Sequence, residues 1–226
     1  MTQMQTGWWA THPYERRSVD ADVEEFAGWP TLLRLVEAAE KPRDRAFLAT
    51  LFETGGRVSE TLALRRDNFD VITEEGVIVV KGMPLLKRFR KLSEYTDEDG
   101  VTRWETETLE ATRRPFPILM AEPLAPIVVE WVEASEGLLF PSPRRPGPLS
   151  RFWAYKLIKK ISEETGVPCW PHWFRSQRAS QLVADYGFEV IDLVDYFSWR
   201  KSDIALTYAR RGWRGLASKM RPVKYV

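Results

Sequence analysis

The chain has 226 residues, of which 44% are hydrophobic, and this is enough to build one substantial core. It contains nothing close to the roughly 18 consecutive apolar residues of a membrane span, and no basic-then-apolar leader, so we expect a cytoplasmic protein without a membrane partner. Cys169 is the single cysteine, which excludes an internal disulfide and a cysteine-based zinc site and leaves a buried thiol as the expected state.

Charge is divided unevenly along the chain, although the formal net charge is only +1. Residues 1–143 hold 17 Lys and Arg against 25 Asp and Glu, whereas residues 144–226 hold 16 against 7. The basic C-terminal third is therefore the part expected to face a polyanion. A solvated basic face of a helical bundle explains the same charges equally well, so motifs must decide.

Residues 1–27 show no periodicity and are too few for an independent domain, and we predict an N-terminal arm there. Apolar residues at helical spacing begin at Trp29, and we predict that Pro42 is the first residue of a second helix. Gly55 and Gly56 end that helix, and a third helix is predicted to begin near Arg57.

A β-branched run at residues 76–82 and an extended stretch at 112–118 predict a small hairpin sheet around a charged insert. Helical periodicity returns at 124–134 and 149–165, and then runs almost continuously over 172–211 with an interruption at Gly187. The prolines of 141–148 predict an exposed loop. The fold class is therefore mainly α with a small antiparallel β-sheet (α+β).

The residues that could act on a phosphate are Arg, His and Tyr rather than metal ligands. A glycine-rich phosphate loop, a His-Glu-x-x-His motif and clustered aspartates are all absent, so we expect no cofactor and no metal site. His172 and Arg175 are three residues apart, which places them on one helix face. With Arg57, two guanidinium forks could grip one phosphate and stabilise the charge of a pentacoordinate transition state.

Tyr208 is a candidate nucleophile, because nearby cations favour phenolate over phenol. Its neighbours in sequence include Arg200, Lys201, Arg210 and Arg211. Taken alone, however, Tyr208 is more often a half-buried core residue, and His172 and Trp199 also have ordinary structural explanations. Only the joint occurrence of these residues gives the catalytic interpretation weight.

The sequence resembles the tyrosine recombinases and phage integrases over about residues 29–211. The pieces that match, in the family's order, are Thr54-Gly55-Gly56-Arg57-Val58-Ser59-Glu60, Lys81-Gly82, His172-x-x-Arg175, Trp199 and Tyr208. The resemblance implies a recombinase catalytic-domain fold over residues 28–211. It also implies site-specific recombination of DNA through a 3′-phosphotyrosyl intermediate, without metal or ATP.

The resemblance assigns a role to each matching position. Tyr208 would be the nucleophile, and Arg57 and Arg175 would clamp the scissile phosphate. His172 would bind that phosphate or transfer a proton, and Trp199 stands where relatives have histidine or tryptophan.

Two further roles are implied near the first arginine and the hairpin. Lys81, at the end of a predicted strand, would protonate the leaving 5′-oxygen, and Lys87 is the alternative for this role. Glu60, one turn from Arg57, would orient that arginine from the second shell of the site, unless it forms a simple surface ion pair.

Three positions depart from the family pattern. Gly56 stands where a larger apolar residue is common, Ser176 replaces a frequent second histidine, and Phe197-Ser198-Trp199 replaces the usual Leu-Gly-His. Family members also carry an N-terminal helical domain, which so short a leading segment cannot supply, so either a catalytic fragment or a minimal form is expected.

Double-stranded DNA is the partner that the resemblance implies, and the expected location is the cytoplasm in association with the nucleoid. We expect a homo-oligomer, a tetramer, assembled on DNA, with residues 212–226 as a C-terminal tail that docks on a neighbouring subunit. Two alternatives remain open: a catalytically silent DNA-binding relative, and a nicking-closing enzyme of the type IB topoisomerase or telomere-resolvase kind.

Overall fold

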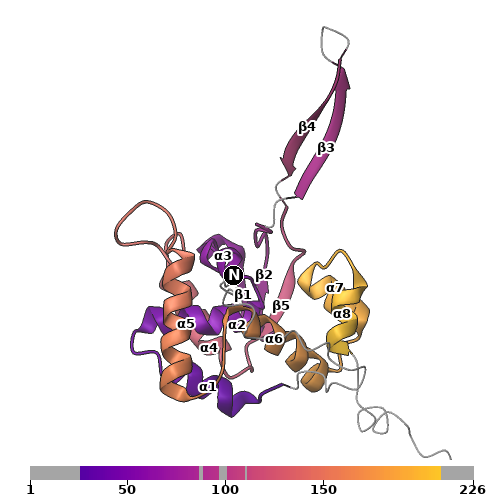
Figure 1. Ribbon diagram of the computed structural model, residues 1–226. Helices are drawn as coiled ribbons and strands as arrows, with labels where there is room; N and C mark the ends of the chain where they lie inside the picture. The colour runs from indigo at the N-terminus through magenta and orange to yellow at the C-terminus, as the bar shows by residue number, and fades with distance from the viewer. Residues whose placement is uncertain (1–25, 87–88, 97–100, 110, 210–226) are drawn as a thin grey trace, which may run out of the picture. The chain divides into compact units, whose positions relative to one another are not determined.

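A computed structural model describes residues 26–86, 89–96, 101–109 and 111–209 (Figure 1). Helices dominate this part of the chain, and two small antiparallel sheets accompany them. The α-helices are α1 (Trp29–Glu37), α2 (Pro42–Thr54), α3 (Val58–Leu62), α4 (Ala125–Glu133), α5 (Arg151–Thr165), α6 (Pro171–Tyr186), α7 (Val190–Phe197) and α8 (Ser202–Ala209). The strands are β1 (Phe69–Ile72), β2 (Val77–Val80), β3 (Phe89–Thr96), β4 (Thr102–Leu109) and β5 (Phe116–Leu119). The predicted α+β fold class is confirmed.

Helix α2 is the centre of the core, since it packs against α1, α3, α4 and α6. Pro42 is its first residue, as predicted, and every residue from Ala46 to Thr54 is buried. The helix ends at Gly55, which adopts the left-handed conformation with φ 53°. A Cβ atom at Gly55 would lie 2.5 Å from the ring of Phe197, so glycine is needed there for space as well as for conformation.

The three-stranded sheet has the order β1-β2-β5, with both pairs antiparallel. Alternate residues face the core: Ile78 and Val80 in β2 pair with Ile118 and Phe116 in β5, and all four side chains are buried. The predicted pairing of residues 76–82 with 112–118 is therefore confirmed. Strand β1 was not predicted. It has only four residues, too few to show a clear alternation, and the 3-10 turn Thr73–Glu75 lies between it and β2.

A second hairpin, β3–β4, occupies the charged insert between β2 and β5. Its ladder runs in register from the pair Phe89–Leu109 to the pair Thr96–Thr102. The sequence did not reveal these strands, since a two-stranded ladder is held by backbone hydrogen bonds and β4, TRWETETL, has no apolar alternation.

The C-terminal bundle is more divided than its periodicity suggested. Gly187 interrupts the helical run, as predicted, and the structure shows that it ends α6 in the left-handed conformation. A second break, at Ser198, separates α7 from α8. Cys169 is a buried free thiol, and burial raises its pKa to about 11. Within the described residues, no helix has the length and apolar composition of a membrane span.

A buried ion cluster joins three of these helices. Arg178 of α6, wholly buried, contacts the carboxylates of Glu53 in α2 at 3.0 Å and Glu122 at 2.7 Å, and donates to the Tyr196 hydroxyl of α7 at 3.0 Å. Burial raises the pKa of Glu53 well above its usual range. Burial also acts to raise the pKa of Glu122, but the hydrogen bond from Glu53 and the charge of Arg178 outweigh it, so the pKa of Glu122 is lowered. We infer that Glu53 holds a proton and Glu122 is the ionised partner of Arg178.

Replacing Arg178 should therefore lower the free energy of unfolding more than replacing an exposed arginine does. We expect Arg178→Met to lower the free energy of unfolding by about 3–5 kcal/mol, because it leaves a buried carboxylate without its cation. The matched control is Arg114→Met, which removes an exposed ion pair with Asp195 and should cost at most about 1 kcal/mol. Urea denaturation measures both, and equal losses would contradict the role given to the cluster.

Candidate active site

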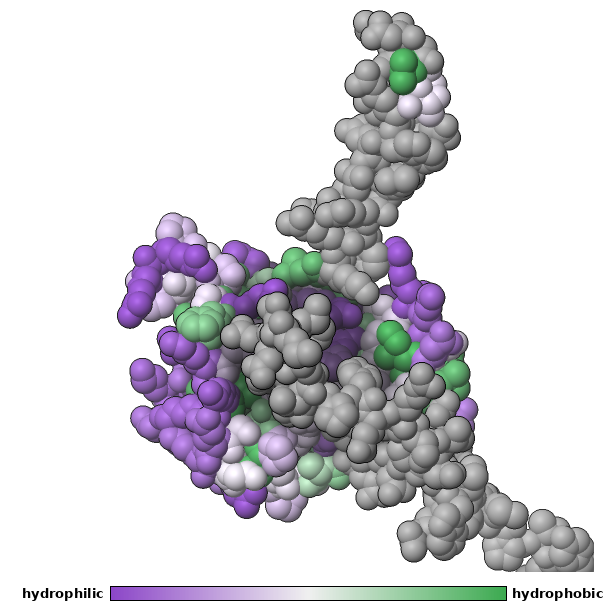
Figure 2. Space-filling model, in the orientation of Figure 1, coloured by the Kyte–Doolittle hydropathy of each residue, from purple (hydrophilic) through white to green (hydrophobic). Residues whose placement is uncertain are grey.

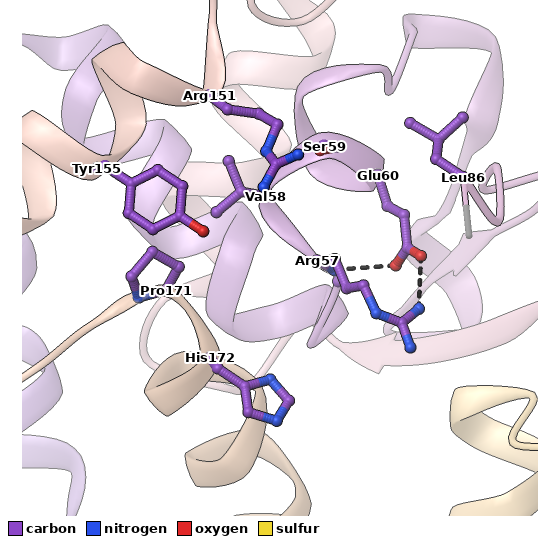
Figure 3. Close-up of a pocket in the computed structure, with 10 residues that line it drawn as sticks. Arg57, Val58, Ser59, Glu60, Leu86, Arg151, Tyr155, Pro171 and His172 are labelled. Atoms are coloured by element: carbon purple, nitrogen blue, oxygen red, sulfur yellow. Dashed lines mark hydrogen bonds and ion pairs between the residues drawn. The ribbon is translucent and has the colours of Figure 1, made fainter. Parts of the chain in front are cut away.

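The turn after α2 presents Arg57 at the start of α3. The backbone N–H of Arg57 donates to one carboxylate oxygen of Glu60 at 3.0 Å, and its guanidinium donates to the other at 2.7 Å (Figure 3). The Glu60 side chain is buried, whereas 42% of the Arg57 side chain is exposed. One side of the guanidinium is thus held in place, and the remaining N–H groups are available to a ligand.

Arg175 lies one turn into α6 and is buried. It donates to the carbonyl oxygen of Gly55 at 2.6 Å, and its guanidinium lies 4.7 Å from the ring centre of Phe197 and 5.5 Å from that of Trp199. Burial, followed by the charge of Arg57, lowers the pKa of Arg175 to about 10. The group remains a cation at neutral pH, and within the described part of the chain no carboxylate forms an ion pair with it.

His172 precedes Arg175 by one turn on the same helix, next to the first residue of α6, Pro171. Its imidazole reaches solvent at the pocket, yet the surrounding atoms still desolvate it, and desolvation is the main reason that its pKa is lowered. The positive charges of Arg175 and Arg57 lower the pKa further. His172 is therefore mostly neutral at pH 7.

Tyr208 lies on α8, which packs against α6 and α7. Its ring stacks on Trp199 with ring centres 5.6 Å apart, and Trp199 stacks in turn on Phe197 at 4.6 Å. The Tyr208 hydroxyl is 3.2 Å from the Ser176 hydroxyl, and either oxygen can be the donor. The Tyr208 phenol also acts electrostatically on the guanidinium of Arg175, so the tyrosine hydroxyl lies near the buried arginine of the same chain.

A pocket of about 350 Å³ opens between α3, α5 and the start of α6 (Figure 3). Arg57 and His172 lie on its wall, and Arg151 and Tyr155 of α5 line it from another side. Cationic and hydroxyl-bearing side chains thus share one concave surface with a few apolar side chains. This arrangement is typical of a site that binds an oxyanion such as phosphate.

Residues 29–212 match the Phage integrase family. The chain belongs to that family. No curated protein sequence gives a significant match.

Solved structures of recombinases share the integrase fold of this chain. A structure of the XerH site-specific recombinase bound to difH substrate aligns with a TM-score of 0.58 at 14% identity, over 87% of this chain and 53% of that one. The XerA recombinase aligns with a TM-score of 0.57 at 18% identity, covering 85% and 62%. The Tn1549 transposon integrase in complex with circular intermediate DNA aligns with a TM-score of 0.53 at 17% identity, covering 84% and 63%. The chain spans between half and two thirds of the length of these proteins.

Six of the residues singled out in the sequence gather around Arg175 in this integrase-family chain. They are Arg175 itself and five residues around it, Arg57, Glu60, His172, Trp199 and Tyr208. Arg57, Glu60 and His172 also line the pocket, whereas Arg175, Trp199 and Tyr208 do not. The carboxylate of Glu60 is buried, so a simple surface ion pair does not describe it.

Lys81 is not among the residues that line the pocket. Its ammonium group pairs with the carboxylate of Asp70 at 2.6 Å, and nearly half of the side chain is exposed. Lys87, the alternative, lies outside the described residues, but Leu86 immediately before it lines the pocket. The choice between the two lysines remains open.

Arg113 is a buried cation beside the site that sequence reasoning did not identify. Its guanidinium donates to the carbonyl oxygens of Thr54 at 2.7 Å and Tyr196 at 2.5 Å, and lies 3.8 Å from the ring centre of Phe116. Burial, followed by repulsion from Arg175, lowers its pKa to about 9. An arginine inside a predicted strand is a weak signal, because its burial is not readable from the sequence.

Ser198 shows how one departure from the family pattern is accommodated. It has φ 50° and ends α7, in the left-handed conformation that glycine adopts most easily. Its hydroxyl accepts a hydrogen bond from the backbone N–H of Arg114 at 3.0 Å. The break that positions Trp199 is therefore retained without glycine.

The electrostatics of the pocket can be measured directly on His172. The chain has two histidines, so His12→Gln leaves a single imidazole to follow by proton NMR. We expect His172 to titrate below the usual 6.5, and Arg57→Gln to raise its pKa, because one of the repelling charges is removed. Arg65→Gln is the control and should leave the pKa unchanged. A His172 pKa of 6.5 or more in the unaltered site would contradict this description.

Proposed function

We propose that the chain is the catalytic domain of a site-specific DNA recombinase or integrase that cleaves and rejoins DNA through Tyr208. The observation that carries the proposal is the arrangement around Arg175, where the Tyr208 hydroxyl, Arg57 and His172 converge from separate helices. Membership of the phage integrase family supports it, and so does the fold shared with recombinases.

In the proposed reaction, the scissile phosphate binds between Arg57 and Arg175. The Tyr208 oxygen attacks phosphorus, the bond from phosphorus to the 5′-oxygen breaks, and a 3′-phosphotyrosyl bond forms. His172 is kept mostly neutral and can take up the tyrosine proton, while a lysine ammonium gives its proton to the leaving 5′-oxygen. Reversal of these steps by another 5′-hydroxyl rejoins the strand, so no external energy source is needed.

The two arginines suit this transition state for a physical reason. Arg175 is already desolvated and fixed by the Gly55 carbonyl, and Arg57 is fixed by Glu60, so neither group has to reorganise when negative charge develops on the phosphate. Trp199 contributes by stacking, since its ring supports that of Tyr208.

Double-stranded DNA is the proposed substrate. The XerH recombinase is bound to difH substrate in its structure, and the Tn1549 integrase is in complex with circular intermediate DNA. We further propose a catalytic domain of residues 28–211 and a tetramer assembled on DNA in the cytoplasm, associated with the nucleoid. Residues 212–226, which lie outside the described residues, would dock on a neighbouring subunit.

Loss of the nucleophile tests the proposal. Nicked duplexes that cover the DNA flanking the gene should trap a covalent protein–DNA adduct, visible as a shifted band on a denaturing gel. Tyr208→Phe should abolish the adduct while DNA affinity in a mobility-shift assay stays within about twofold. Tyr186→Phe is the control, because the hydroxyl of this tyrosine bonds to Glu122 and does not line the pocket, and this variant should still form adducts.

The outcomes separate the rival functions. Adducts that persist in Tyr208→Phe would overturn the assignment, and DNA binding without any adduct would favour a catalytically silent relative. Relaxation of supercoiled plasmid without recombinant products would favour a nicking-closing enzyme.

The lysine that acts as the general acid can be identified with a DNA substrate whose leaving group does not need to be protonated. Removing the acid should slow cleavage by about 10²–10⁴-fold. We expect either Lys81→Ala or Lys87→Ala to do this, and a substrate with sulfur in place of the bridging 5′-oxygen should restore the rate of that variant alone. If the sulfur substrate rescues neither variant, neither lysine is the acid.

A further inference from the structure

Helix α5 directs two side chains into the pocket that the proposed chemistry does not use. Arg151 and Tyr155 are four residues apart, so they lie on one face of the helix, and both line the pocket with Arg57 and His172 (Figure 3). Helix α5 packs against α3 and α6, the two helices that carry Arg57 and His172. Its first turn is capped by Ser150, whose hydroxyl accepts from the backbone N–H of Trp153.

Arg151 is an uncompensated charge at this surface. The charge of Arg57 is matched by Glu60, whereas Arg151 forms no ion pair with any residue in the described part of the chain. Tyr155 is 46% exposed, and Figure 3 shows its hydroxyl end turned toward the interior of the pocket. A cation and an exposed phenol are therefore both available to a ligand.

The pocket is too large for a single phosphate. Its volume is about 350 Å³, whereas a phosphate group has only five heavy atoms. Arg57 lies on the wall of the pocket, but Arg175 and Tyr208 do not line it. A phosphate bound between the two arginines would therefore sit at the edge of the pocket and leave room in it for the next part of a DNA strand. The ring of Tyr155 and the side chain of Leu86 offer apolar surface to a sugar, while Arg151 offers a cation to a phosphate.

We propose that Arg151 and Tyr155 form a second DNA-backbone subsite, which binds the phosphate and deoxyribose next to the scissile phosphate. The inference rests on the proposed function, because it takes the Arg57–Arg175 site as the place where the scissile phosphate binds. The subsite fixes the direction in which the cleaved strand leaves the site, and it binds backbone without reading bases.

The salt dependence of DNA binding tests the subsite without any cleavage. In a Tyr208→Phe background, each phosphate contact contributes about 0.9 to the slope of log K against log salt. Arg151→Gln should lower this slope by about that amount, whereas Arg151→Lys should preserve it. Lys160→Gln is the matched control: its pairs with Glu40 and Glu164 place it on a different flank of α5, which is hydrophilic (Figure 2), and the slope should not change.

The position of the contact can be mapped with methylphosphonates, which remove one phosphate charge at a time from the DNA. In the Tyr208→Phe protein, affinity should fall when the neutral group replaces the scissile phosphate and when it replaces one adjacent phosphate. Arg151→Gln should lose the sensitivity at the adjacent phosphate only. Tyr155→Ala should weaken binding more than Tyr155→Phe, because the ring contacts the sugar.

The two possible failures are distinguishable. If Arg57→Gln lowers the salt slope and Arg151→Gln does not, the subsite is wrong and the proposed function stands. If neither substitution alters the slope or the methylphosphonate pattern, DNA does not bind at this pocket, and both are wrong. Circular dichroism of each variant verifies that the fold is intact.

Discussion

The buried pairing of Arg178 with Glu53 and Glu122 is the interaction on which the site depends. The loss of one partner from a buried ion pair leaves an uncompensated charge away from water, so the cluster stabilises this arrangement of the helices that contribute to it. It fixes α6 against α2, and through Tyr196 it fixes the end of α7. Arg175 lies one turn before Arg178 on α6, and its position is set by the same constraint.

The end of α2 accounts for the other buried cations. The last carbonyl groups of a helix lack partners within it and carry partial negative charge. Here Thr54 and Gly55 offer their oxygens to Arg113 and Arg175 respectively, so two guanidiniums satisfy this helix end. The carbonyls hold Arg175 without neutralising it as a carboxylate would, and a concentrated positive field remains on a chain whose net charge is only +1.

Each departure from the family pattern has a partner group in the structure. A Cβ at Gly56 would lie 2.2 Å from the end of Met83, which occupies the space of a larger residue. Ser198 keeps the left-handed break with the help of a backbone donor, and Ser176 contacts the Tyr208 hydroxyl. None of these compensations was visible in the sequence, because the paired positions are between about 27 and 84 residues apart.

The sequence by itself determined the fold class, most helices and the β2–β5 pairing, because hydrophobic periodicity and the glycines that end helices are local signals. It also determined the identity of the residues that gather around Arg175, because the order of the motifs is distinctive. It did not reveal the β3–β4 hairpin, whose ladder is made by backbone groups. Only the tertiary structure decided which cations are buried, that Lys81 pairs with Asp70, and that Arg151 and Tyr155 share a pocket with Arg57. Burial and pairing depend on contacts between distant segments, and the periodicity of one segment carries no record of them.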